Sequence, residues 1–129
     1  MSASRTLGTS PYESLYGFSR AVRVGNPILV SGTAPVGEYG SSTPGDAAAQ
    51  ARRCFAIILK AVEELGGSAA DIVRTRMFIT DAGDADQIGA VHGEIFCGIR
   101  PAATMVVVKA LLRDEWRVEI EAEALVQGD

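Results

Sequence analysis

The chain has no long hydrophobic run, and its N-terminus is polar. No apolar stretch approaches the ~20 residues that a helix needs to cross a bilayer, so we expect no membrane partner. Residues 1–17 also lack the apolar segment that a signal peptide requires, so we expect a cytoplasmic protein. Hydrophobic residues still make up 47% of the 129 positions, which is enough for a single domain, 1–129, with its own core.

Cysteine and histidine are scarce. The two cysteines, Cys54 and Cys97, form neither a metal-ligand pair nor a disulfide framework. His92 is the only histidine, and no cluster of cysteine or carboxylate residues stands beside it in the sequence. A metal site needs several such ligands together, so we expect no metal. Cys54 falls inside a helical pattern and is interpreted as a small core residue.

Positive charge is also in short supply. The formal net charge is −4, and lysine and arginine form no cluster along the chain. Nucleic-acid binding usually depends on a basic patch that collects phosphates. We therefore expect no nucleic-acid partner.

The first half of the chain predicts a hairpin followed by a long helix. Two strands, residues 17–25 and 27–37, flank a turn at Gly25 and Asn26, while the first dozen residues look irregular. The helix is predicted to start after Thr43 as N-cap, with Pro44 at its first position. Apolar residues then recur at helical spacing until the glycines at 66 and 67 end the helix.

The second half adds a single turn at 68–71, a strand at 72–80, a helix at 85–96 and two strands within 100–126. In the last strand Val118, Ile120, Ala122 and Ala124 alternate with Glu119, Glu121 and Glu123. This period of two predicts a half-buried strand with a carboxylate-rich second face. The order of elements indicates an α+β fold in which two helices pack on one face of a mixed sheet.

The opposite face of that sheet lacks a cover. The strand at 103–111 is apolar on both of its faces, which is typical of a strand buried on both sides. Because the sequence predicts only two helices, we expect another copy of the chain to cover this face. A closed homo-oligomer with a ligand groove between subunits follows from this expectation.

Five segments resemble the Rid family (YjgF, or reactive intermediate deaminase), formerly labelled endoribonuclease L-PSP. They are VGNPILVSGTAPV at 24–36, GDAAAQARRCFAIILKAVEELG at 45–66, DIVRTRMFITD at 71–81, RPAATMVVV at 100–108 and VEIEAEAL at 118–125. The resemblance implies a chorismate-mutase-like fold and a homotrimer with three sites between subunits. It also implies hydrolysis of reactive imines and enamines to a carbonyl compound and ammonia, without metal or organic cofactor.

The resemblance places Glu119 at the family's water-positioning glutamate, and Ser31 and Gly32 at its serine-glycine pair beside the ligand. At other site positions this chain departs from the family. The carboxylate-binding arginine, the cysteine and the tyrosine of the family correspond here to Ala103, Met105 and Phe18. The chain is thus similar to an arginine-less branch, and we expect a more apolar cleft with an uncharged or weakly polar ligand.

Two arginines are candidates to replace the missing cation. Arg20 lies two residues after Phe18, and we hypothesise that it supplies the positive charge of the site; the alternative is a solvated strand arginine. Arg100 stands on the far side of Pro101 and is expected to point elsewhere.

Three functions remain open from the sequence. The first is a hydrolytic deaminase in which Glu119 holds and deprotonates the attacking water. The second is a non-catalytic, small-molecule-binding or regulatory homotrimer, since a strand face of glutamates is often simply solvated. The third, an endoribonuclease or translation inhibitor, is disfavoured by the acidic composition and the lone histidine.

Overall fold

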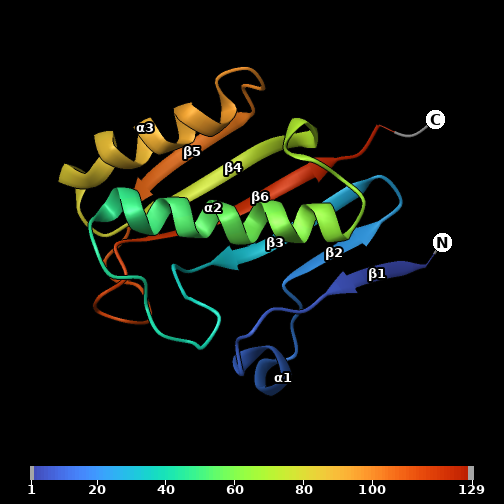
Figure 1. Cartoon of the computed structure of the whole chain (residues 1–129), viewed down its shortest axis with the longest axis horizontal. Coiled ribbons are helices and arrows are strands. Elements are labelled where there is room, and N and C mark those ends of the chain that lie inside the picture. The colour runs from blue at the N-terminus through green and yellow to red at the C-terminus, as the bar shows by residue number, and fades with distance from the viewer. Residues whose placement is uncertain (1, 128–129) are drawn as a thin grey trace.

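Residues 2–127 are described by a computed structural model, in which one mixed sheet is covered on one face by two long helices (Figure 1). The strand order is β1-β2-β3-β6-β4-β5. This arrangement confirms the α+β fold with helices on one face. The elements are β1 (Ala3–Thr6), α1 (Tyr12–Tyr16), β2 (Ala21–Val24), β3 (Pro27–Thr33), α2 (Ala47–Glu64), β4 (Ile72–Ile79), α3 (Ala85–Phe96), β5 (Ala102–Val107) and β6 (Val118–Leu125).

The N-terminus is more ordered than its sequence indicates. The prediction of irregular structure there was wrong, because β1 pairs antiparallel with β2 and the short helix α1 follows it. A four-residue strand is too short to display a clear period of two, so hydrophobic patterning misses it. The β2–β3 hairpin around Gly25 is confirmed, and Gly25 takes a φ of +68°, which favours glycine.

The long helix α2 begins later than predicted. Its N-cap is Asp46, whose side chain accepts a hydrogen bond from the Ala49 N–H at 2.9 Å. Thr43 and Pro44 lie outside the helix because Gly45 between them and Asp46 has a φ of +104°, which no right-handed helix contains. The predicted end is confirmed, since Gly66 follows the helix with a φ of +90°.

The core lies between the sheet and the helices α2 and α3. The alternation predicted for β6 is confirmed, because Val118, Ile120, Ala122 and Ala124 are all buried. Cys54 of α2 is fully buried, as expected of a core residue, and burial raises the pKa of its thiol far above the usual range. His92 of α3 packs against two phenylalanines of this core and lies 2.8 Å from the Thr75 hydroxyl.

The strand β5 is an edge strand and is not buried on both sides within one chain. It pairs only with β4, in parallel, and Val106 and Val107 are 43% and 55% exposed. The expectation of burial therefore fails for the isolated chain. Cover by a second copy stays a prediction.

Among the described residues, no helix combines the length and apolar character needed to cross a bilayer.

Gly93 of α3 offers a test of the helix assignment. A Cβ at this position would meet no neighbouring atom within 4 Å, so only the conformational freedom of glycine is lost on substitution. We expect Gly93→Ala to raise the free energy of unfolding by ~0.5–1 kcal/mol, measured by urea denaturation. Gly66→Ala serves as the control and should be destabilised, because an L-residue is strained at a φ of +90°. A less stable Gly93→Ala protein would contradict the assignment.

Candidate functional site

The site is built on a bulge between β3 and β6. Val30 pairs with Ala122 and Thr33 pairs with Ile120, so Ser31 and Gly32 together face the single residue between those partners. An extra residue of this kind bends the strand and changes the direction of nearby side chains. The Ser31 hydroxyl has a partner within the chain, because it donates a hydrogen bond to the Ser19 carbonyl at 2.8 Å.

Glu119 lies directly over this bulge. Its neighbours Val118 and Ile120 point into the core, and its cross-strand partner is Phe78, so Glu119 lies on the sheet face that the helices leave free. A Cβ added to Gly32 would overlap Glu119 Oε2 and lie 3.4 Å from its carboxyl carbon. Glycine at position 32 therefore allows the close approach of the carboxylate to the backbone.

Arg20 is joined to the same bulge. Its Nη2 donates hydrogen bonds to the carbonyls of Ser31 at 2.6 Å and of Gly32 at 2.7 Å. Burial lowers the pKa of Arg20, while the negative charges of Glu13 and Glu119 oppose that change. Within residues 2–127 its Nε is buried without a hydrogen-bond partner. The alternative of a solvated strand arginine does not describe this side chain.

The electrostatic surroundings of Glu119 suit a base. Burial raises the pKa of the Glu119 carboxyl. The positive charge of Arg20 lowers this pKa, and the negative charge of Glu121 raises it further. A raised pKa makes a carboxylate a stronger proton acceptor while Arg20 favours its ionised form. Glu121 and Glu123 differ, because both form ion pairs with Arg76 at 3.1 Å; of the ion pairs among the described residues, none includes Glu119.

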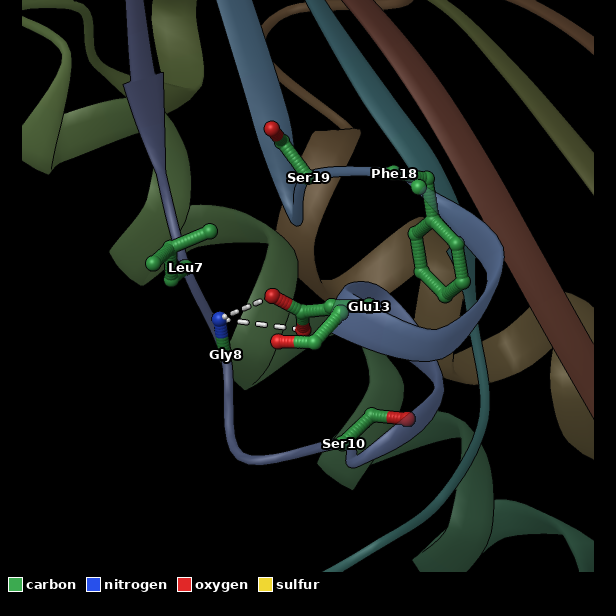
Figure 2. Close-up of a pocket in the computed structure, with 8 residues that line it drawn as sticks. Leu7, Gly8, Ser10, Glu13, Phe18 and Ser19 are labelled. Carbon is green, nitrogen blue, oxygen red and sulfur yellow. Dashed lines mark hydrogen bonds between the residues drawn. The ribbon is translucent and has the colours of Figure 1, made fainter.

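An open hollow of about 400 Å³ lies where α1 meets β2, and Phe18 forms part of its wall (Figure 2). Phe18 is 39% exposed, so its ring can contact a bound molecule. On the other side of the hollow, both carboxylate oxygens of Glu13 accept hydrogen bonds from the Gly8 N–H at 3.0 Å. Glu13 itself is 6% exposed.

Ala103 and Met105 do not meet Glu119 within one chain. They lie on β5 opposite Thr75 and Met77 of β4, which point into the core, so they belong to the helix-covered side of the sheet. Two strand spacings, ~10 Å, also separate β5 from β6. A single chain therefore does not bring Ala103 and Met105 together with Glu119.

Arg100 also stands apart from this group. It is exposed in the turn after α3 with a φ of +58°, and its N–H donates to the Phe96 carbonyl. Its charge does not contribute to the pKa shift of Glu119, whereas that of Arg20 does.

Glu13 and Gly8 were not found from the sequence. A signal was present, since Ser10 and Pro11 precede the five residues of α1 and Gly17 follows them, as at many helix ends. In the part of the chain that the structure describes, no group of three or more His, Cys, Asp or Glu residues could hold a metal ion.

Comparison with known proteins gives one family. A family model described as Endoribonuclease L-PSP matches residues 9–126. The 2-iminobutanoate/2-iminopropanoate deaminase of Escherichia coli K12 is 33% identical over 126 residues, which cover 95% of this chain and 98% of that protein.

Solved structures agree with this match. A member of the YjgF/YER057c/UK114 family from Mycobacterium tuberculosis is 39% identical, with a TM-score of 0.89 over 97% of this chain and 100% of that one. Escherichia coli TdcF with bound serine is 28% identical, with a TM-score of 0.82 over 95% of this chain and 94% of that one.

Proposed function

The chain belongs to the Rid/YjgF family, whose matching model is described as Endoribonuclease L-PSP, and on this premise we propose that it hydrolyses a small reactive imine or enamine. The observation that carries the proposal is the position of Glu119, a partly buried carboxylate held over Gly32 beside Arg20. The named activity of the Escherichia coli relative supports the same reaction class.

The reaction needs one well-placed base. Ionised Glu119 accepts a proton from a water molecule as the water oxygen adds to the carbon of the protonated C=N bond. Glu119 then gives this proton to the nitrogen of the carbinolamine, the C–N bond breaks and ammonia leaves, and the hydroxyl group loses its proton to solvent as the carbonyl compound forms, which replaces the proton first taken up by the imine. The sum is imine plus water giving carbonyl compound plus ammonia, and Glu119 ends as it began.

The substrate is expected to lack a carboxylate. Ala103 offers no positive charge at the position where the family's arginine would bind a carboxylate. Phe18 has no hydroxyl where the family has a tyrosine. Arg20 is held in another way, because its Nη2 donates hydrogen bonds to two backbone carbonyls. We therefore propose a neutral imine, such as one derived from a simple amine.

A homotrimer is part of this proposal. The exposed valines of β5 and the separation of Ala103 and Met105 from Glu119 both support a site completed by a neighbouring copy. In such a cleft, Met105 and Ala103 of one subunit would face Phe18 and Glu119 of another.

The test is a panel of two imines, one from an amino acid and one from a simple amine, with ammonia release as the readout. We expect turnover of the neutral imine alone by wild type, and none above background by Glu119→Gln. Ala103→Arg adds the missing cation and should confer turnover of the carboxylate-bearing imine. Turnover that persists in Glu119→Gln would refute the proposed mechanism.

The second candidate is a small-molecule binder without catalysis, favoured by the loss of the family's arginine at Ala103. A folded trimer that binds small amines or carbonyl compounds but turns over neither imine would establish it. RNA cleavage that survives both Glu119→Gln and moderate salt would instead indicate the endoribonuclease activity in the family's description.

A further inference from the structure

We propose that Arg20 is a positioning residue that joins the N-terminal helix α1 to Glu119 and holds that carboxylate ionised over the bulge. The consequence for catalysis rests on the proposed function, whereas the contacts of Arg20 do not depend on it. Arg20 touches no proposed substrate atom. It acts through the backbone of Ser31 and Gly32 and through its charge.

Arg20 clamps the backbone of the bulge at Ser31 and Gly32. A bulge leaves ladder hydrogen-bond groups without their regular partners. Arg20 Nη2 donates hydrogen bonds to the carbonyls of both bulge residues, Ser31 at 2.6 Å and Gly32 at 2.7 Å, and so fixes the peptide over which the Glu119 carboxylate lies. The backbone of Arg20 is held as well, because its N–H donates to the Thr6 carbonyl and its own carbonyl accepts from the Ser31 N–H.

Arg20 also lies next to Glu13 of α1. A Cβ at Gly8 would lie 2.8 Å from Glu13 Oε2 and 3.3 Å from Arg20 Cδ, so the stem of Arg20 and the carboxylate of Glu13 meet at this glycine. Glu13 is buried, and its oxygens are held by the Gly8 N–H (Figure 2). Arg20 therefore lies between two carboxylates, Glu13 on the α1 side and Glu119 on the β6 side, and the charges of both act on it.

Glu121 and Cys54 also interact electrostatically with Glu119. Glu121 lies on the same strand face, and the Cys54 thiol of α2 is near enough for its pKa to be affected by Glu119. Burial and Glu121 both favour protonated Glu119, which cannot accept a proton from water. Arg20 is the cation that opposes them. Buried Arg20 therefore has a role in this arrangement that requires no contact with a substrate.

The experiment measures the ionisation of Glu119 directly, by ¹³C NMR of carboxyl-labelled glutamate in the full chain across a pH titration. In Arg20→Met we expect the pKa of Glu119 to rise further, and the acid limb of the pH–rate profile to move to higher pH by the same amount. Arg20→Lys keeps a positive charge and should return the pKa most of the way towards the wild-type value.

Glu13→Gln is a second variant that leaves the clamp on the bulge in place. It removes one negative charge that competes for Arg20, so the pKa of Glu119 should fall, opposite to the effect of Arg20→Met. If Arg20→Met does not fold, this variant tests whether Arg20 and Glu13 act on the pKa of Glu119. An unchanged pKa of Glu119 in Glu13→Gln would then overturn the inference.

Arg23→Met is the matched control. Arg23 lies on the same hairpin and also binds backbone carbonyls, those of Gly25 at 2.8 Å and Leu65 at 2.7 Å, but its charge does not contribute to the pKa shift of Glu119. We expect lower stability there with an unchanged pKa of Glu119. A shift equal to that of Arg20→Met would reduce Arg20 to a structural role.

The outcomes separate this inference from the proposed function. Wild type without imine turnover, but with the expected shifts in the pKa of Glu119, would reject the function and retain the positioning role. Wild type with turnover, and a pKa of Glu119 that ignores Arg20, would retain the function and reject the positioning role.

Discussion

Glu119→Gln is expected to lower kcat for hydrolysis of a neutral imine by ~10²–10⁴-fold, the range that a positioned general base contributes. Glutamine has nearly the same shape, so KM should change little, but its amide cannot take a proton from water. The measurement is steady-state ammonia release by protein shown to keep the wild-type oligomeric state.

Glu121→Gln and Glu123→Gln are matched controls for this prediction. Both glutamates lie on the same strand and face as Glu119, yet both are paired with Arg76. Glu121→Gln breaks one ion pair and Glu123→Gln breaks two, with Arg76 and Arg74, each on a half-exposed surface and worth ~0–1 kcal/mol, so both variants should keep kcat within a few-fold of wild type. An equal loss in all three variants would mean that the charge of the whole face matters, and not Glu119 as a base.

The pH dependence of the same variants has a definite sign. The ionised form of Glu119 is the active one, so kcat/KM of wild type should rise with pH through a pKa raised by burial and level off above it. Stability follows the opposite course. Because the folded pKa of Glu119 exceeds its unfolded value of ~4.3, its favourable contribution is present below that value and is lost as pH rises through the folded pKa.

Glutamine is neutral at every pH, so Glu119→Gln avoids this loss. At neutral pH the variant is expected to be at least as stable as wild type, although it is inactive. Urea denaturation at two pH values checks this, and a variant clearly less stable than wild type at neutral pH would contradict the assigned cause of the pKa shift.

Gly32→Ala is expected to lower kcat by roughly 10–100-fold while the fold survives, because small displacements of a catalytic group cost rates of this size. The added methyl group would overlap Glu119 Oε2. The colliding atom is the end of a flexible side chain, so the carboxylate can rotate away at little cost to stability. The activity loss and the thermal midpoint are measured together.

Gly93→Ala is the control here, since it adds the same methyl group in open space on α3 and should leave kcat unchanged. A double variant, Gly32→Ala with Glu119→Gln, adds a second check. If the methyl group acts only by displacing the carboxylate, the double variant should be no slower than Glu119→Gln alone. A further loss would point to a second function of the Gly32 backbone.

Much of the fold could be predicted because its signals are local. The burial of Val118 and Ile120 follows from a period of two, and the bounds of α3 at Ala85 and Phe96 follow from helical spacing between turn residues. Where a local signal was weak or misread, prediction failed. The short strand β1 has too few residues to show a period, and the helix start moved from Thr43 to Asp46 because Gly45 adopts a positive φ.

The sequence by itself determined the fold class and the identity of the candidate base. Alternating residues on β6 place Glu119 on the face opposite the core, and the spacing of five segments points to the family. Only the tertiary structure decided what surrounds that base. The approach of Arg20 and Gly32 to Glu119 depends on the strand order, on a bulge and on a buried N-terminal glutamate. These are contacts between residues far apart in the chain, and no periodicity along a single strand or helix encodes them.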